Sequence, residues 1–482
     1  MRNRKKLTAA LLGLCMAAAS VMNVSAAEQS MHDINIDGSY DVLDVICLSK
    51  YLLRQPIASI DLKAADMDGD GQVDVFDLGL LKREVFAHAV EVPVSQNTVL
   101  LSDGFTAKSV AAAEMDEATV LGQTRFALEL MQKAAKSGKN SLVSPYSVSQ
   151  ALGMMANGAD GDTRKEMEAV LGGSMETLNA AFYTFRTNTP QNEGVKLSTA
   201  NSIWVKNNFK VKDSFLQTNA DYYGADVYAA PFNRETVKRV NDWVDTNTDH
   251  MIQHIIDDLS ESKLCLVNAV AFDGKWEKEY DDDHVKEDVF RAADGSTQTV
   301  QMMYDNTVKT YLEDAHATGF MRWYQDANYA FAALLPEEGM TPEAYLNTLT
   351  PESLHKVLAK RQKAEVHTAM PEFSYDYDVC LNEPLADMGM PTAFSAGKAD
   401  FSLAAEDPRG LFIQNVAHKT HIEVTPKGTR AAAATAITVG VTCVEPPVEV
   451  KTVILDRPFV YMIVDTQTNL PVFFGTVNSV SE

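Results

Sequence analysis

The segment that most restricts the possible folds reads KGTRAAAATAITVGVTCVEPP, residues 427–447. After Arg430 it carries no charged side chain before Glu445, and it includes four alanines in a row. The interior of a sheet favours larger side chains, and a solvated loop favours polar ones. A fixed helix fits poorly because β-branched residues follow the alanines. We therefore predict a segment that is an exposed loop at one time and a buried strand at another.

With the two-residue period of a strand, residues 428–442 divide into two different faces. One face collects Thr429, Ala431, Ala433, Thr435, Ile437, Val439 and Val441. These side chains are small at the leading end and larger behind it, which suits a strand that slides between two existing strands. The other face carries the single charge, on Arg430, and could stay in solvent.

The N-terminal segment is typical of an export signal. Four basic residues within the first six precede an apolar run, and small residues at positions 25–27 offer a cleavage site. We predict a signal peptide over residues 1–27 and a secreted, extracellular protein. The formal net charge of −24 argues against nucleic acid or an anionic membrane as partner, because both attract clustered Lys and Arg.

Two acidic segments, residues 33–44 and 66–77, share one arrangement of oxygen-bearing side chains. Counted from the first Asp, these side chains occupy positions 1, 3, 5, 9 and 12, and a glycine at position 6 allows a sharp turn. Such EF-hand-like loops surround calcium with roughly six to eight oxygens. We predict two calcium ions, held by Asp33, Asn35, Asp37, Asp41 and Asp44 in the first loop and by Asp66, Asp68, Asp70, Asp74 and Asp77 in the second.

A helix-like stretch follows each loop, and the second unit lies 33 residues after the first. Both loops close with Asp rather than Glu, and no full helix precedes the first loop. In these features residues 30–88 resemble a dockerin, a small all-α domain that docks proteins onto cohesin modules of cellulosome scaffolds. The resemblance implies that Val42, Leu43, Val75 and Phe76 face the cohesin. The alternative is that these side chains pack the two halves together.

Residues 89–117 lose regular periodicity and are predicted to form a linker. From residue 118 onward helices and strands do not alternate strictly, which predicts an α+β domain. We expect a helix over residues 118–139 and strands over 262–276, 329–336 and 458–465. The widely spaced Cys47, Cys265, Cys380 and Cys443 are interpreted as free thiols.

The sequence offers little support for an enzyme. It contains no G-x-S-x-G, H-E-x-x-H or phosphate-loop motif. His250 and His254 could share one helix face, for which a solvated surface is a better interpretation than a zinc site. His418 and His421 would point to opposite faces of one strand. A hydrolase is therefore the least favoured class.

Further segments make residues 118–482 resemble an inhibitory serpin. They read LVSPYSVSQALGMMANGADGDTRKEMEAVLG (142–172), TANSIW (199–204), LVNAVAFDGKWEKEYD (266–281), MPEFSYDYDVCLNEPLADMGM (370–390), NVAHKTHIEV (415–424) and RPFVYMIVDTQTNLPVFFGTV (457–477). The resemblance implies an α+β serpin fold with three β-sheets, eight to nine helices and an exposed reactive-centre loop. Residues 427–447 match the start of that loop and the loop itself.

The resemblance also implies a mechanism and its residues. A serine protease attacks the loop, forms an acyl-enzyme, and is trapped when the cleaved loop inserts as a new strand. The hinge of this movement is Gly428, Thr429, Arg430, Ala431, Ala432, Ala433 and Ala434. Ser147, Ser149, Asn268 and His418 match the shutter, beneath the place where the sheet opens, and Trp276 matches the breach, where insertion begins. Pro426 replaces the acidic residue usual before the hinge, so the breach contact should differ.

The reactive bond is expected between Thr442 and Cys443, and the next two bonds toward the C-terminus remain open alternatives. No Lys or Arg precedes any of these bonds, which favours a subtilisin- or elastase-like target with a small or apolar specificity pocket. We expect a monomeric bacterial inhibitor with no catalytic residue of its own, tethered to a cohesin. The alternative is a noninhibitory serpin that acts as a scaffold-bound binding module.

Overall fold

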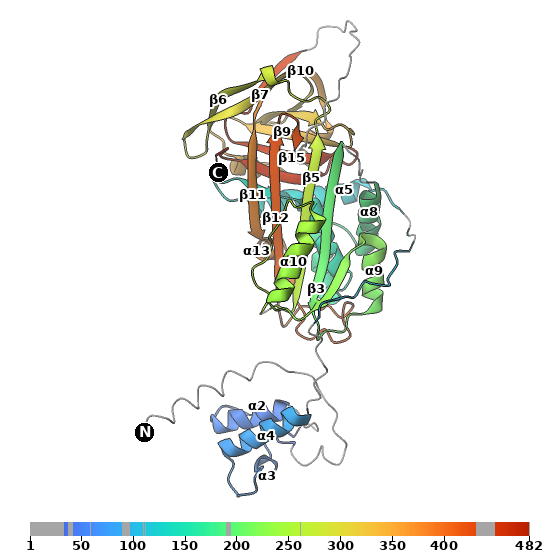
Figure 1. The fold of residues 1–482 in the computed structure, drawn as a ribbon, viewed down its shortest axis with the longest axis vertical. Coiled ribbons are helices and arrows are strands. Elements are labelled where there is room, and N and C mark those ends of the chain that lie inside the picture. Colours follow the sequence, from blue (N-terminus) through green and yellow to red (C-terminus); the bar gives the residue numbers. More distant parts are fainter. Residues whose placement is uncertain are drawn as a thin grey trace. The chain divides into compact units, whose positions relative to one another are not determined.

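The computed structural model describes residues 33–36, 42–57, 59–88, 97–108, 110, 112–188, 194–260, 262–429 and 449–481. The chain divides into two units, residues 1–94 and 95–482 (Figure 1). The predicted signal peptide and reactive bond lie outside the described residues, as do Asp37, Asp41, Arg430 and the four hinge alanines. Within the described ranges no helix is both long and apolar enough to cross a membrane.

The first unit is all-α, as predicted. It contains α2 (Val42–Leu52), α3 (Leu62–Ala65) and α4 (Val75–His88). The two longer helices each place the last Asp of a predicted calcium loop in their first turn, Asp44 in α2 and Asp77 in α4. The core of this unit consists of Ile34, Val45, Cys47, Leu48, Ala65 and Leu81. The closing Asp of each predicted loop therefore lies in a helix, and these two helices pack against each other.

The second unit contains a seven-stranded main sheet. Its order is β1 (Val99–Leu100), β4 (Asp226–Ala230), β3 (Val195–Lys206), β5 (Leu264–Lys275), β13 (Gly428–Thr429), β12 (Asn415–Thr425) and β11 (Phe373–Cys380). Strands β3 and β5 are antiparallel, whereas β5 and β12 are parallel. Near-continuous apolar residues in β5 agree with a central strand that is covered on both faces.

The second sheet of this unit has nine strands. They are β14 (Val450–Ile454), β10 (Gln362–Pro371), β7 (Thr297–Glu313), β8 (Ala317–Trp323), β9 (Tyr329–Pro336), β15 (Phe459–Asp465), β16 (Pro471–Val477) and β2 (Ser141–Val143), with β6 (Val285–Arg291) paired to β7. The three predicted strands are confirmed as β5, β9 and β15. The described residues form two hydrogen-bonded sheets rather than three, because the unbroken 17-residue β7 pairs with β6 and β10 and, at its end, with β8.

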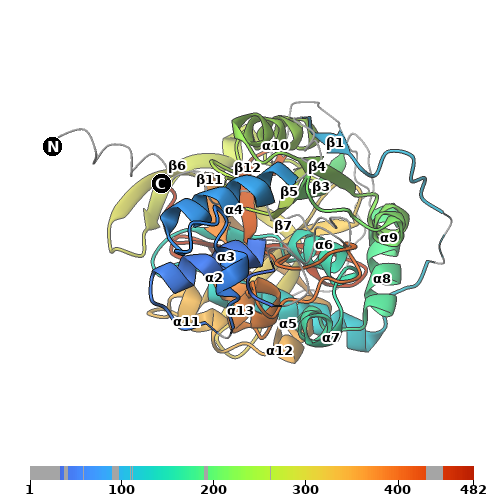
Figure 2. The ribbon, with the colours of Figure 1, turned by 90° about the horizontal axis from the view of Figure 1, so that it is seen from below.

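Nine α-helices occur among the described residues of the second unit, in agreement with the expected number. They are α5 (Glu117–Ala134), α6 (Pro145–Ala156), α7 (Gly161–Leu171), α8 (Met175–Asn188), α9 (Asp213–Tyr223), α10 (Arg234–Asn247), α11 (Pro342–Leu346), α12 (Pro351–Ala359) and α13 (Asn382–Asp387), with 3-10 turns at Asp282–His284 and Pro391–Phe394. Helix α10 covers one face of the main sheet and α6 lies on the other (Figure 2). The main sheet is therefore buried from both sides.

The prediction of a linker over residues 89–117 is wrong for its second half. Strand β1 pairs with the edge strand β4, and Phe105 and Met115 pack against the core of the second unit. The backbone N–H of Lys108 donates to the Asp221 carboxylate at 2.7 Å. The segment lacks periodicity because residues 99–108, 110 and 112–115 form a strap that contacts several elements in turn.

Candidate functional site

The hinge begins inside the main sheet. Strand β12 ends at Thr425, residues 426–427 turn, and the two-residue β13 then lies between β12 and β5. Gly428 adopts a φ of +156°, and a Cβ at this position would stand 2.2 Å from the carbonyl oxygen of Gly274. Only glycine allows the chain to enter this narrow space.

Thr429 is the last described residue before the loop, and it is only 2 % exposed. Its Oγ1 lies 2.6 Å from the hydroxyl oxygen of Tyr324, which is itself fully buried. This hydrogen bond satisfies both hydroxyls inside the protein, where an unpaired one would be costly. The predicted hinge therefore starts as a short strand that is already inserted and held by a side chain.

Trp276, the predicted breach residue, holds the turn before the hinge. Its indole N–H donates to the carbonyl of Thr425 at 2.9 Å, and its backbone N–H donates to the carbonyl of Lys427 at 3.0 Å. The indole stacks on Tyr324, with ring centres 4.7 Å apart. The carbonyl of Pro426 accepts from the backbone N–H of Tyr280 at 2.9 Å. The main chain of residues 425–427 therefore supplies three hydrogen bonds at the breach.

A buried ion pair between Arg322 and Asp305 lies beside the breach. Burial acts to raise the pKa of Asp305, but the guanidinium and nearby hydrogen-bond donors outweigh it and hold that pKa below its usual value. Arg322 also donates to the carbonyl of Lys278, and its guanidinium lies over the rings of Trp276 and Tyr280. Arg322 was not predicted from the sequence, because only the fold brings these residues together.

The shutter residues meet where β5 and β12 pair directly. His418 and Asn268 are register partners, and the Nδ1 of His418 lies 3.0 Å from the Asn268 Oδ1. The Nε2 of His418 accepts from the backbone N–H of Ser144 at 3.0 Å, so Nδ1 carries the proton and donates. Burial lowers the pKa of His418 to about 3. The imidazole is therefore neutral and joins both strands to the helix behind them.

Asn268 extends this network to β3. Its amide donates to the backbone carbonyl of Ser147 at 2.7 Å and to Asn201 Oδ1 at 2.7 Å, and it also contacts the Ser147 hydroxyl. The hydroxyl of Ser149 instead donates to Tyr146 within the same helix. The structure thus brings Ser147, Asn268 and His418 together and leaves Ser149 outside the network. It adds Ser144 and Asn201, which sequence spacing alone did not select.

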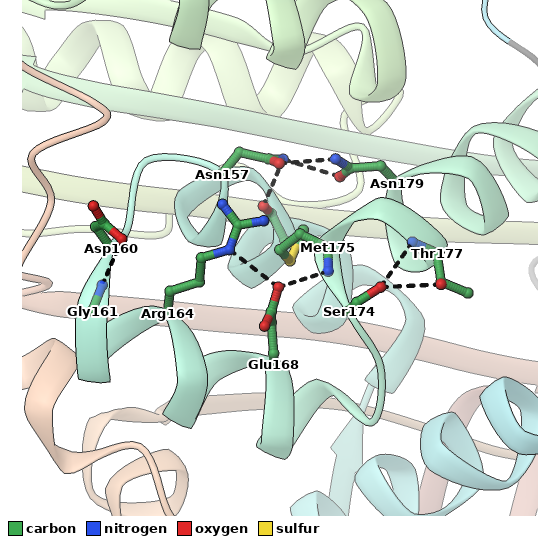
Figure 3. Close-up of polar contacts among 10 residues, drawn as sticks. Asn157, Asp160, Gly161, Arg164, Glu168, Ser174, Met175, Thr177 and Asn179 are labelled. Carbon is green, nitrogen blue, oxygen red and sulfur yellow. Dashed lines mark hydrogen bonds and ion pairs between the residues drawn. The ribbon is translucent and has the colours of Figure 1, made fainter.

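Helix α6 holds the serines of the shutter in place. Ser144 is its N-cap and Pro145 its first residue, a combination that starts a helix sharply. At the other end Asn157 and Asn179 exchange amide hydrogen bonds of 3.0 and 2.8 Å (Figure 3). Asn157 also donates to the carbonyl of Gly153 within α6, so the amide pair with Asn179 ties the end of α6 to α8. The helix therefore forms a rigid support behind the point where the sheet must open.

The second predicted calcium loop converges in space. Ligand oxygens of Asp66, Asp68 and Asp70 lie within 4.8 Å of one another. The Oδ1 of Asp66 is buried and has no hydrogen-bond partner among the described residues, as expected for an atom that would bind a cation. Asp77 is buried, yet hydrogen bonds from the backbone of Asp74 and Met67 outweigh this burial and hold its pKa below the usual value. These carboxylates fit calcium and would be its ligands.

The first loop is described only at its two ends. Asp44 corresponds to Asp77, and its Oδ1 accepts from the backbone N–H groups of Ile34 and Asn35 at 2.8 and 3.1 Å. Asp33 and Asn35 lie at the start of the loop, and the side chain of Val42 falls outside the described part of the chain. Among the predicted cohesin contacts, Leu43 is 48 % exposed, Val75 68 % and Phe76 71 %. These three side chains do not pack the two halves together.

Among the described residues, His250, His254, His421 and the three described cysteines form no metal or catalytic cluster. The prediction of a shared helix face is wrong for His250 and His254, because α10 ends at Asn247 and each imidazole instead pairs with a nearby Asp. His421 does lie on the opposite face of β12 from His418, as expected, and pairs with Asp376. Cys47, Cys265 and Cys380 are free thiols, and Cys443 lies outside the described residues.

Comparison with known proteins agrees with this geometry. A family model described as serpin (serine protease inhibitor) matches residues 121–480, and one described as dockerin type I domain matches residues 31–86. The chain therefore belongs to the serpin family and carries an N-terminal dockerin type I domain. Dockerin domains of this type are calcium-binding modules of cellulosomes, and serpins are generally inhibitors rather than catalysts.

Two curated relatives cover most of the second unit. Leukocyte elastase inhibitor A of Mus musculus is 31 % identical over 376 residues, which cover 74 % of this chain and 98 % of the relative. Serpin B10 of Otolemur garnettii is 30 % identical over 389 residues, which cover 73 % and 97 %. These identities extend over nearly the whole length of each relative, so the similarity concerns the complete serpin domain.

Two crystal structures of the thermophilic serpin tengpin are also similar. The native state has 40 % identity and a TM-score of 0.75, and covers 80 % of this chain and all of tengpin. The latent state has 38 % identity and a TM-score of 0.68, with 77 % and 100 % covered. Both structures cover the whole of tengpin, so the likeness extends over the complete serpin unit.

Proposed function

We propose that the chain is a secreted inhibitor of serine proteases that acts as a suicide substrate by loop insertion. The observation that carries this proposal is the half-open main sheet. At one end β13 already separates β12 from β5, and at the other end residues 415–419 pair directly with residues 265–269. The strands are therefore parted at the breach, and insertion of the loop would continue that separation through the shutter.

The energetics support this direction of change. Insertion would replace five direct register pairs between β5 and β12 by a new strand that is hydrogen-bonded on both sides. Each net hydrogen bond contributes about 0.5–1.5 kcal/mol, so a strand of about 15 residues gains on the order of 10 kcal/mol before the cost of ordering it. The small side chains on the leading face let this gain begin without steric resistance.

The target that we propose is a subtilisin- or elastase-like serine protease. The support is the absence of Lys and Arg before the bond between Thr442 and Cys443 and before the two bonds that follow it. A relative at 31 % identity is itself named as an inhibitor of leukocyte elastase. The serpin domain contributes no catalytic group in this mechanism, since the protease performs the chemistry on its own acyl-enzyme.

We propose that the dockerin binds two calcium ions and a cohesin module, and that the protein acts extracellularly on a bacterial cellulosome. The support is the convergence of Asp66, Asp68 and Asp70 and the exposure of Leu43, Val75 and Phe76. Exposed apolar side chains on a small helical unit are typical of a partner-binding surface. The inhibitor would thereby be concentrated where exported enzymes are exposed to proteases.

A noninhibitory serpin is the second candidate, and Pro426 is the observation that favours it. Proline replaces the acidic residue usual at this position. Position 426 therefore contributes only a backbone carbonyl hydrogen bond at the breach, and no carboxylate. A thermal melt of the intact and the loop-cleaved protein separates the two candidates. An inserting loop should raise the Tm on cleavage by up to about 10 °C, as expected for a gain near 10 kcal/mol in a unit of this size. An unchanged Tm would contradict insertion and favour the noninhibitory role.

A further inference from the structure

An exposed acidic segment lies beside the breach. Residues 277–288, EKEYDDDHVKED, hold seven Asp and Glu and two Lys. Apart from Tyr280 they are exposed or partly exposed, and they include the 3-10 turn Asp282–His284 and the start of β6. Glu277, Glu279, Asp282, Asp283 and Glu287 form no ion pair with any residue that the structure describes. The segment therefore presents uncompensated negative charge.

This acidic segment is hydrogen-bonded to the chain just before the hinge and borders a pocket together with the strand that follows the loop. The backbone N–H of Tyr280 binds the carbonyl of Pro426, just before the hinge. A pocket of about 230 Å³ is lined by Tyr280, Asp281 and His284 on one side and by Ile454, in the strand that follows the loop, on the other. In Figure 1 strand β6, which continues the segment, lies at the same end of the second unit as β10 and β7. A protease attacking the loop would meet this surface.

The pocket contains an unusual polar group. Tyr280 is 6 % exposed, and its hydroxyl has no hydrogen-bond partner within the described chain. A buried hydroxyl without a partner costs free energy, which an incoming donor would recover. Its ring already lies under the Arg322 guanidinium, 3.9 Å from the ring centre. An ammonium or guanidinium group could donate to this hydroxyl and pair with the neighbouring carboxylates.

We propose that residues 277–288 and this pocket form a secondary docking surface for a cationic face of the target protease. The proposal rests on the proposed function and adds a second determinant of target choice. The residues around the reactive bond select proteases by their specificity pocket, and this surface selects proteases by the charge of the face that docks on it. Carboxylates at the rim of an interface mainly accelerate association and make it salt-dependent. The other possible occupant, a small cationic ligand, is an outcome of the test.

The test compares two matched pairs of neighbouring aspartates. Asp282→Asn with Asp283→Asn removes two charges from the docking surface. Asp257→Asn with Asp258→Asn removes two exposed charges before β5, at the opposite end of that strand from the breach; there Asp257 pairs with His254 and Asp258 accepts from Ser260. Association with neutrophil elastase, a cationic elastase-like protease, is measured by stopped flow from about 0.02 to 0.5 M salt, a range over which screening becomes strong.

We expect the first pair to slow association by about three- to tenfold at low salt and to match the wild type at high salt, while the second pair leaves the rate unchanged. The proposal would be overturned if the wild type and the first double variant associate at equal rates at low salt. It would also be overturned if both double variants lose the same fraction of the association rate. If a small cationic ligand occupies the pocket instead, millimolar arginine amide should compete for the site, and the first pair of substitutions should leave the association rate unchanged. That result would also overturn the proposal. If cleavage occurs without complex formation, the proposed inhibition fails, and the salt dependence of loop cleavage still tests the docking surface.

Discussion

The hydroxyl oxygens of Thr429 and Tyr324 lie 2.6 Å apart, where the hinge enters between β5 and β12. Tyr324 comes from the loop between β8 and β9, and it stacks on Trp276. A side chain from a loop of the second sheet thus holds Thr429, the last described residue of the inserted hinge. The breach is a preformed entrance, and its stability sets how readily the following alanines can enter.

We predict measurable coupling between these two hydroxyls. Tyr324→Phe and Thr429→Val each remove one partner, and the double variant removes both. A double-mutant cycle on urea unfolding should give a coupling free energy of about 1 kcal/mol, because each single variant leaves one buried hydroxyl unpaired. Strictly additive effects would mean that the hydrogen bond contributes nothing to the entrance.

Thr429→Arg should convert the inhibitor into a plain substrate. The site is 2 % exposed and lies between two strands, so a guanidinium there would be buried without an anionic partner. Insertion would stall while cleavage continues, and an SDS gel would show cleaved protein with little complex. Thr429→Ser, which keeps the hydroxyl, is the matched control and should still form the complex. Full inhibition by the Arg variant would contradict insertion through this position.

Acidification should weaken the shutter through His418. Burial lowers its pKa from 6.5 to about 3, so the unfolded chain binds the extra proton throughout that interval and the folded protein does not. The stability that depends on the neutral imidazole is therefore complete above pH 6.5 and falls below it, by at most about 1.4 kcal/mol per pH unit. Urea midpoints between pH 7 and 5 should fall more steeply for wild type than for His418→Gln, and parallel slopes would refute the assignment.

Calcium titration should show two ions in the full protein and one in Asp66→Ala. Asp66 Oδ1 is the buried atom without a partner in the second loop, so its loss removes a ligand that no other described group replaces. Isothermal calorimetry measures the stoichiometry. Asp61→Asn is the control, because Asn can also cap α3 and position 61 lies outside both loops. Unchanged stoichiometry in Asp66→Ala would argue against the predicted ligand set.

Removal of the strap should destabilise the serpin unit. A chain that begins at residue 97 keeps β1, Phe105 and Met115, whereas one that begins at residue 117 loses the pairing with β4 and these apolar contacts. We expect the shorter chain to have a Tm lower by several degrees, since each buried large side chain contributes about 1.5–3 kcal/mol. If the two chains have equal Tm values, residues 97–116 contribute nothing to stability, as expected for a simple linker.

Local patterns predicted the elements whose side chains repeat regularly. Strands β9 and β15 and helices α2 and α4 follow directly from apolar periodicity and loop spacing, and the resemblance supplied Asn268 and His418. The strap was missed because its contacts alternate among α8, α9 and β4, so no single period appears in its sequence.

The contacts between segments that are distant in the chain could not be predicted from the sequence either. Ser144 joins the shutter through its backbone N–H, which no side-chain pattern reveals. Tyr324 and Arg322 reach the breach from the second sheet, about a hundred residues before the hinge in sequence. The roles of such residues can be identified only from the folded structure, in which the two sheets lie together.

The central claim is that cleavage of the loop drives its insertion and traps the protease. The most direct test incubates the purified protein with subtilisin, pancreatic elastase and trypsin, followed by SDS gel electrophoresis and mass spectrometry. We expect an SDS-stable complex with subtilisin or elastase and release of a C-terminal peptide that begins at Cys443 or within two residues of it. Clean cleavage at that bond by these proteases, with no stable complex, would contradict it.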